Sequence, residues 1–406
     1  MHRPDRKEIF HDIETVIFDM DGVITSEAEY WNAADLTVLE LFYSKQFLGL
    51  ENETLQTALH KPGAPITLER FVSPRFIAML KTSGINTNWD LTYFSAALYL
   101  IEFLAEIKPH DKVQALFESP FNINTLHDLG KLIDKKRKLL EPIDNLNAYF
   151  VQFRKKRLAE KPLRNENPAD HEPLAERLVE DINAWRYERT GFHSPVFERS
   201  GPFWDICTTL FQERYLGDSL YLKEHDARLS DIPKDGMIQD ERPVIPGAKV
   251  ISTLALLKEA GMRLGVATGR PFDEIMIPLK RWGVFHFFDK GSIATYREIA
   301  EAEQYLCGKG IICSIAKPHP YVYLRAIFPD KSVGELLDMK MPLPKKTGGR
   351  ILVVGDSMSD LIAARTLGAL AAVVLTGVKS LEAVDQMRAL DPDFILDDIS
   401  QFEGLF

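Results

Sequence analysis

Cysteine is scarce in this chain, and the few cysteines form no recognisable pattern. There are three in 406 residues, Cys207, Cys307 and Cys313. So low and odd a number argues against a disulfide framework, and their spacing matches no metal-binding motif. We therefore expect a protein of a reducing compartment.

Long hydrophobic runs are also missing. The longest apolar stretch, Leu91 to Ile101, ends at Glu102. It is too short to cross a bilayer, which takes about 20 apolar residues. The first residues, Met1 to Glu8, are charged and contain no apolar signal region. These features predict a cytoplasmic protein without a membrane partner.

An excess of basic residues is absent as well. The 49 lysines and arginines are outnumbered by 59 aspartates and glutamates, so the formal net charge is −10 at pH 7. Nucleic-acid-binding proteins usually have more lysine and arginine than aspartate and glutamate, so we expect no nucleic-acid partner here. The acidic total does not exclude a phosphate substrate, because the local field at a site matters more than the net charge.

What the chain does contain is a short apolar run that ends in two carboxylates. Residues 16–25 read Val-Ile-Phe-Asp-Met-Asp-Gly-Val-Ile-Thr, which places Asp19 and Asp21 two residues apart. The run predicts a buried strand whose carboxyl end, where open α/β sheets place their sites, carries both acids. One carboxylate can attack as a nucleophile while the other transfers a proton, and together they can hold a hard cation such as Mg²⁺.

Three further motifs follow in a consistent order. Residues 264–270 form a second apolar strand with a hydroxyl and a glycine at its end, residues 314–318 present a lysine before a proline, and residues 351–360 form a strand followed by two more carboxylates. A single Asp-x-Asp pair is common in loops and proves little by itself. The occurrence of all four motifs in this order would be a rare coincidence. The side chains and glycine that these motifs present are Thr268, Gly269, Arg270, Lys317, Asp356 and Asp360.

Together the four motifs resemble those of the haloacid dehalogenase-like (HAD) superfamily, in its phosphatase and phosphomutase branch. The resemblance covers the expected catalytic core, residues 1–26 and 242–406. It implies that Asp19 is the nucleophile, forming an aspartyl-phosphate, and that Asp21 is the general acid and base. It also implies Mg²⁺ as the cofactor, with one metal contact from the backbone carbonyl of Asp21.

The remaining motif residues have expected roles around the phosphoryl group. Thr268 offers a hydroxyl to a phosphate oxygen, and the backbone of Gly269 can approach closely because it has no Cβ. Lys317, at the position that the superfamily uses, would neutralise the phosphoryl charge and hold Asp19 in place. Arg270 has two interpretations: it binds a phosphate or substrate carboxylate, or it pairs with a surface acid.

The last motif supplies the expected metal ligands. Asp356 would complete the Mg²⁺ shell, while Asp360 is either a further ligand or a residue that orients the others. A hard cation between acidic ligands and phosphate oxygens supplies Lewis-acid and templating effects.

The chain is expected to fold as an α/β protein, a doubly wound parallel-sheet (Rossmann-like) core with a large, mostly α-helical inserted cap domain. Strands alternate with helices after residue 263, which predicts the parallel sheet. Residues 27–241 far exceed the dozen or so residues that a crossover needs, so they are assigned to the insert. Apolar spacing of three and four predicts its helices, which are Leu36–Phe42, Arg75–Leu80, Leu91–Ile107, Leu126–Leu140, Leu146–Leu158, Leu174–Trp185 and Phe203–Tyr215.

The expected function is the Mg²⁺-dependent hydrolysis of a small-molecule phosphate monoester. An acid at position 21 favours phosphate esters, since the dehalogenases and phosphonate-cleaving members of the superfamily lack it. An insert after the first motif resembles the helical-cap group, which includes phosphoglycolate phosphatase and β-phosphoglucomutase. Trp31 stands where the mutases carry a histidine. A phosphomutase and a non-catalytic HAD-fold binding protein remain alternatives.

Glu27, Tyr30 and Trp31 have two interpretations, because they follow the first motif directly. In the first, all three side chains face the substrate. In the second, Tyr30 and Trp31 pack in the core of a helix instead. A large closed cap would exclude water and bulky substrates, which favours a small soluble ester over a phosphoprotein.

Overall fold

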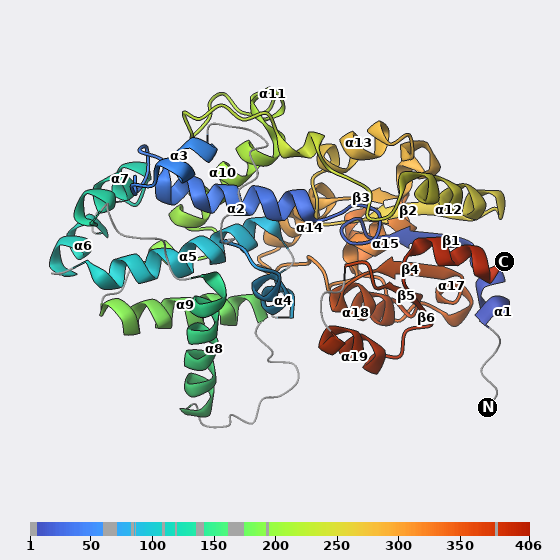
Figure 1. Cartoon of the computed structure of the whole chain (residues 1–406). Helices are drawn as coiled ribbons and strands as arrows, with labels where there is room; N and C mark the ends of the chain where they lie inside the picture. Colours follow the sequence, from blue (N-terminus) through green and yellow to red (C-terminus); the bar gives the residue numbers. More distant parts are fainter. Residues whose placement is uncertain are drawn as a thin grey trace. The chain divides into compact units, whose positions relative to one another are not determined.

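The protein divides into two compact units. The computed structural model describes residues 6–59, 71–82, 85, 87–107, 110–117, 120–134, 142–160, 174–191, 195–377 and 381–406. One unit comprises Met1–Ala28 and Ile238–Phe406, and the other comprises Glu29–Met237. Figure 1 labels most of the helices and strands of both.

A parallel sheet forms the centre of the first unit, as predicted. Among the described residues its strand order is β3-β2-β1-β4-β5-β6, and every pairing is parallel. The direction of winding changes between β1 and β4, so the loops after these strands diverge at the point where open α/β sheets bind ligands. The strands are β1 (Thr15–Phe18), β2 (Arg263–Ala267), β3 (Ile293–Ala294), β4 (Ile351–Gly355), β5 (Leu370–Val374) and β6 (Phe394–Leu396).

Both faces of the sheet are covered, which explains why its strands are continuous apolar runs. Successive side chains of β1 point to opposite faces: Val16 and Phe18 belong to one core cluster and Ile17 to another. On the Val16 face lie α1 (Arg6–His11), α12 (Gly247–Glu259), α13 (Phe272–Arg281) and η6 (Ile399–Leu405). On the Ile17 face lie α14 (Tyr296–Cys307), α15 (Tyr321–Ile327), α16 (Val333–Leu337), α18 (Met358–Leu367) and α19 (Leu381–Ala389).

The segment before β4 is not entirely a loop. Residues 338–350 contain two prolines and two glycines, a composition typical of loops. They include a short helix, α17 (Lys345–Gly348), which begins directly after Pro344. A proline immediately before or at the start of a helix is compatible with it, because the first N–H groups have no partner within the helix.

The second unit is helical throughout its described regular structure. All seven predicted helices are present, but the predicted end of Leu126–Leu140 is wrong. Helix α7 ends at Leu132 because the backbone of Ile133 is extended, and residues 135–140 lie outside those described. Three shorter helices, α3, α6 and α11, were not predicted. The helices are α2 (Ala28–Tyr43), α3 (Glu53–Leu59), α4 (Pro74–Thr82), α5 (Asn88–Glu106), α6 (His110–Phe117), α7 (Ile123–Leu132), α8 (Ile143–Glu160), α9 (Leu174–Thr190), α10 (Pro202–Leu216) and α11 (Asp218–Tyr221).

Tyr30 belongs to the interior of this unit. It is buried, and its ring stacks on that of Tyr215 with the centroids 4.2 Å apart. The two rings, on α2 and α10, join these helices at their core. Of the two interpretations of Tyr30, packing in the helix core is therefore correct.

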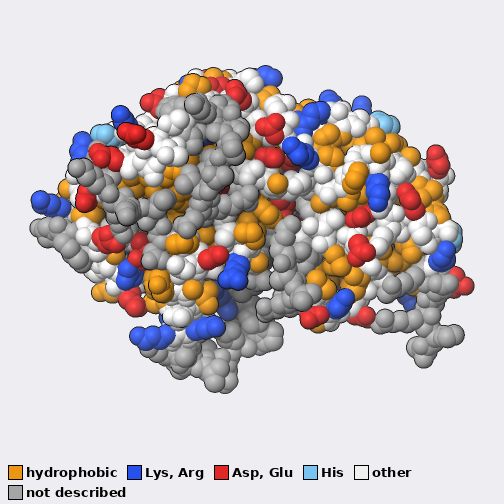
Figure 2. Space-filling model, in the orientation of Figure 1, with side chains coloured by type: hydrophobic (Ala, Val, Ile, Leu, Met, Phe, Trp, Pro, Cys, Tyr) orange, Lys and Arg blue, Asp and Glu red, His pale blue; other side chains and the backbone are white. Residues whose placement is uncertain are grey.

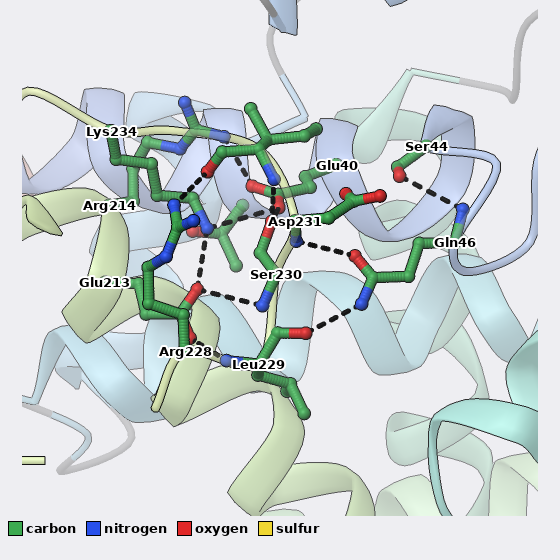
Figure 3. A network of polar contacts seen from close by, with 12 residues as sticks. Glu40, Ser44, Gln46, Glu213, Arg214, Arg228, Leu229, Ser230, Asp231 and Lys234 are labelled. Atoms are coloured by element: carbon green, nitrogen blue, oxygen red, sulfur yellow. Dashed lines mark hydrogen bonds and ion pairs between the residues drawn. The ribbon is translucent and has the colours of Figure 1, made fainter. Parts of the chain in front are cut away.

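A buried network of charges anchors the segment that follows α11 (Figure 3). Lys234 Nζ lies 2.7 Å from Glu213 and 3.2 Å from Glu40, and Arg214 pairs with Glu40. The Ser230 N–H donates to Glu213. Burial would raise the pKa of Glu40, but the charges of Arg214 and Lys234 outweigh it and lower that pKa. Ion pairing is what makes such complete burial of charge tolerable.

The surface carries both signs of charge. On the face drawn in Figure 2, acidic and basic side chains of the described residues are interspersed among hydrophobic and neutral atoms. Within the part of the chain that the structure describes, every helix is too short or too polar to span a membrane.

Candidate active site

The loop after β1 presents the first two acids. The Asp19 N–H donates to the carbonyl of Val354 at 2.8 Å, so the loop begins within the sheet, beside β4. The chain then turns tightly: the carbonyl of Met20 accepts from the N–H groups of Ile24 and Thr25, both at 2.9 Å. The turn leaves Asp19 buried and Asp21 partly exposed.

Lys317 brings the first and last motifs together. Its Nζ lies 2.8 Å from Asp19 Oδ1 and 2.9 Å from Asp360 Oδ1. The ammonium also lies 4.9 Å from the ring centroid of Tyr323. Burial would lower the pKa of Lys317, but the two carboxylates outweigh it and raise that pKa, so the side chain stays charged.

Asp360 is held by the start of α18. Ser357 and Asp360 form a capping box, in which Ser357 Oγ accepts from the Asp360 N–H and Asp360 Oδ2 accepts from Ser357. The hydroxyl of Tyr323 donates to Asp360 Oδ1 at 2.6 Å. Burial alone would raise the pKa of Asp360, but Lys317 and these hydrogen bonds lower it. The structure therefore stabilises Asp360 as a carboxylate.

Asp356 occupies a space that two glycines leave open. A Cβ on Gly22 would lie 2.1 Å from Asp356 Oδ2, and a Cβ on Gly377 would lie 1.6 Å from the same atom. No side chain fits at either position while Asp356 keeps this place. The last motif is thereby packed directly against the loop after β1.

Three carboxylates converge at this edge of the sheet. One oxygen each of Asp19, Asp356 and Asp360 lies within 4.8 Å of the others. Burial raises the pKa of Asp19 to about 7, although Lys317 opposes the rise; Asp360 and Asp21 add to it. Hard carboxylate oxygens are the ligands that Mg²⁺ prefers, so the donor set fits this cation.

Thr268 follows the neighbouring strand β2. It is buried, its N–H donates to the Ala294 carbonyl at 3.1 Å, and its Oγ1 accepts from the Arg270 N–H at 3.2 Å. A Cβ on Gly269 would meet no atom within 4 Å. The turn after β2 therefore leaves room beside Gly269.

Arg270 pairs with acids of the protein. Its Nε lies 3.0 Å from both Asp21 oxygens, and its Nη2 lies 2.7 Å from Glu241 Oε1. Of the two interpretations, pairing with an acid is the one observed here. The expected partner was a surface acid, whereas Glu241 is buried.

Two residues of this arrangement were not singled out from the sequence. Tyr323 lies in a helix among other apolar residues, where an aromatic side chain indicates no more than packing. Glu241 lies in the polar run Asp240-Glu241-Arg242, which is typical of an exposed turn. In neither case does a local pattern signal the contact.

Comparisons with known proteins bear on the resemblance drawn from the motifs. Residues 314–402 match the HAD-hydrolase-like family. The probable phosphatase IndB of Dickeya dadantii (strain 3937) is 26% identical over 198 residues, which are 47% of this chain and 72% of that protein.

The whole fold also has a counterpart among solved structures. The X-ray structure of a Northeast Structural Genomics Consortium target is 23% identical, with a TM-score of 0.70 over 97% of this chain and 98% of that one. At this identity the likeness concerns the fold alone. The resemblance to the haloacid dehalogenase-like superfamily that the motifs predicted is confirmed by the family match over residues 314–402 and by the similarity to a probable phosphatase.

Proposed function

We propose that the protein is a Mg²⁺-dependent phosphatase that hydrolyses a small-molecule phosphate monoester through an aspartyl-phosphate. The observation that carries this proposal is the position of Lys317 between Asp19 and Asp360, at 2.8 and 2.9 Å. Phosphoryl transfer depends mainly on positioning and charge stabilisation, and a nucleophile fixed beside a cation meets both needs. The similarity to a probable phosphatase supports the same reaction.

In the first step, a carboxylate oxygen of Asp19 attacks phosphorus. The bond between Asp19 and phosphorus forms, the ester bond from phosphorus to the leaving oxygen breaks, and Asp21 gives its proton to that oxygen. In the second step, a water molecule attacks the phosphorus, and Asp21 takes a proton from that water. The bond to Asp19 then breaks, which releases phosphate and restores the proton on Asp21.

The other residues stabilise the transferring group. Lys317 balances the phosphoryl charge and keeps Asp19 in place, while Thr268 and the Gly269 backbone bind phosphate oxygens. Asp19, Asp356 and the carbonyl of Asp21 would hold Mg²⁺, which supplies Lewis-acid stabilisation of phosphate oxygens when bound. Asp360 is already engaged by Lys317, Tyr323 and Ser357, which favours an orienting role.

Residues 29–237 are proposed to act as the cap of this site. Both connections to them leave the first unit beside Asp21 and are paired by backbone hydrogen bonds, from Ser26 to Arg242 and from Val244 to Ile24, each 2.9 Å long. A cap attached there would exclude water during the reaction, and a cap of this size would admit small esters more readily than phosphoproteins.

Phosphate release from a panel of metabolite phosphates, p-nitrophenyl phosphate and phosphopeptides tests the proposal. We expect release that requires Mg²⁺, that Asp19→Asn abolishes, and that is faster for a small metabolite than for any phosphopeptide. Faster hydrolysis of phosphopeptides would refute the substrate class.

Silence across the panel would refute the phosphatase itself. A mutase would then show isomerisation of a sugar phosphate in the presence of a bisphosphate primer. A non-catalytic binding protein would show neither release nor isomerisation.

A further inference from the structure

Arg270 lies between two carboxylates that have very different surroundings. Its guanidinium contacts Asp21 through Nε and Nη2, and it contacts Glu241 through Nη2 at 2.7 Å. The Glu241 side chain is completely buried, with 0% exposure, whereas that of Asp21 is 22% exposed. One carboxylate thus faces the accessible site, and the other lies in the interior.

The backbone around Glu241 is fixed from two directions. The Arg281 guanidinium, on α13, donates to the carbonyls of Ile238, Gln239 and Glu241 itself. On the other side, the Ser26 N–H donates to the carbonyl of Arg242. Glu241 is therefore held by the body of the first unit and provides a fixed point for Arg270.

Asp21, by contrast, is partly exposed and acts on the substrate under the proposed function. Glu241 offers Arg270 a second carboxylate, which is buried and takes no part in the chemistry. Arg270 is therefore anchored in the interior, and its Nε is fixed at the place from which it contacts both oxygens of Asp21.

We propose that Glu241 is a positioning residue, which acts through Arg270 to hold Asp21 in the geometry needed for proton transfer to and from the reacting oxygen. The inference rests on the proposed phosphatase function and adds to it a residue outside the four motifs. Proton transfer is sensitive to placement, and small displacements of a catalytic group cost large factors in rate.

The test compares two substrates that differ in their need for a proton. An alkyl phosphate requires protonation of its leaving oxygen, whereas p-nitrophenolate is a stable anion that departs without a proton. The ratio of kcat/KM is informative because kcat/KM reports transition-state stabilisation relative to free enzyme and substrate. We expect Glu241→Ala to lower kcat/KM for the alkyl phosphate by about tenfold more than for p-nitrophenyl phosphate.

Two further variants serve as references for the effect of Glu241→Ala. Asp21→Asn removes the proton donor and should show the same selectivity to a larger extent. Glu241→Gln keeps an oxygen that can accept from Arg270 and should restore part of the alkyl phosphate activity lost in Glu241→Ala. Glu241→Gln also keeps the size of the side chain, which preserves the test if the alanine variant does not fold.

Glu213→Gln is the matched control. Glu213 is also completely buried and ion-paired, but with Lys234 of the second unit. Its loss should leave the ratio between the two substrates unchanged even if the protein becomes less stable. A merely structural role of Glu241 predicts the same behaviour for both glutamates.

Equal losses on both substrates in folded Glu241→Ala, beside a selective loss in Asp21→Asn, would overturn the positioning role. Failure of the proposed function has a different signature, because the wild-type protein would then release no Mg²⁺-dependent phosphate from either substrate. The two failures are therefore distinguishable in one set of assays.

Discussion

Gly22 and Asp356 are in direct contact, although more than 300 residues separate them in the sequence. A Cβ on Gly22 would lie 2.1 Å from Asp356 Oδ2, and the φ angle of Gly22 is +73°, which residues with a side chain rarely adopt. The glycine of the first motif therefore leaves the space that the acid of the last motif occupies. This contact explains why a glycine follows Asp21 directly.

Gly22→Ala is expected to displace Asp356 and weaken metal binding. We predict that the Mg²⁺ concentration for half-maximal phosphate release rises about 10–100-fold, the usual effect of disturbing groups that support metal ligands. Gly283→Ala is the control, because Gly283 has a similar φ of +71° but open space around its Cβ position. Both variants should lose stability through backbone strain; an equal Mg²⁺ requirement in the two would contradict the prediction.

The pKa of Asp19 predicts how stability depends on pH in EDTA. Burial raises this pKa from 3.8 to about 7, so between these values the folded state retains a proton that the unfolded state has lost. Stability must therefore fall as pH rises through this window, by at most about 4 kcal/mol, since one pKa unit corresponds to about 1.4 kcal/mol. Urea unfolding at several pH values measures it.

Asp19→Asn provides the control for this pH dependence. His319, whose pKa is lowered by burial, contributes a slope of the opposite sign, so the contribution of Asp19 is the difference between wild type and variant. Added Mg²⁺ should reduce that difference because a cation favours the ionised carboxylate. Identical slopes for wild type and Asp19→Asn in EDTA would rule out the raised pKa.

The buried charges of Figure 3 predict a large loss of stability on removal of one partner. Lys234→Met leaves Glu40 and Glu213 close together without the ammonium that lies 3.2 and 2.7 Å from them. We expect a loss of about 3–5 kcal/mol in the free energy of unfolding, the usual effect of uncompensated buried charge.

Lys131→Met is the control for this change of side chain. Lys131 pairs with Asp128 at 2.7 Å, but the two side chains are 59% and 42% exposed. Surface pairs contribute at most about 1 kcal/mol, so the stability of this variant should change little. Similar losses in both variants, measured by denaturant unfolding of the second unit, would show that the network of Figure 3 adds nothing beyond a surface pair.

The strands and the acids at their ends could be predicted because both depend on local sequence. A parallel strand buried on two faces must be an apolar run, and Asp19 and Asp356 follow such runs directly. The parallel arrangement then brings the ends of neighbouring strands to one edge of the sheet. The pattern of apolar runs followed by acids is therefore enough to predict both the parallel sheet and the edge at which the candidate site lies.

The partners of these acids could not be predicted in the same way. Arg270 and Glu241 are 29 residues apart, and Glu241 belongs to a polar run without periodicity. Its burial depends on contacts from Arg281 and from the loop at Ser26, which exist only in the folded protein. Long-range pairing of polar groups leaves no pattern in a single sequence.

Tyr323 belongs to the same class of unpredicted contacts, and its hydroxyl offers a specific test. The hydrogen bond from Tyr323 to Asp360 is 2.6 Å long and fully buried, and hydrogen bonds to charged groups contribute about 1.5–3 kcal/mol. Tyr323→Phe should lose stability by about that amount. Its phosphatase activity should also fall, because Asp360 and Lys317 would be less firmly held.

Tyr93→Phe is the matched control, since Tyr93 is equally buried but its hydroxyl makes no hydrogen bond within the described part of the chain. Removing a buried hydroxyl without a partner should leave stability unchanged or increase it, because that group was desolvated without compensation. Thermal unfolding and kcat of both variants decide the matter. Equal stability of the two variants, with unchanged kcat in Tyr323→Phe, would mean that the hydrogen bond to Asp360 neither stabilises the fold nor orients the site.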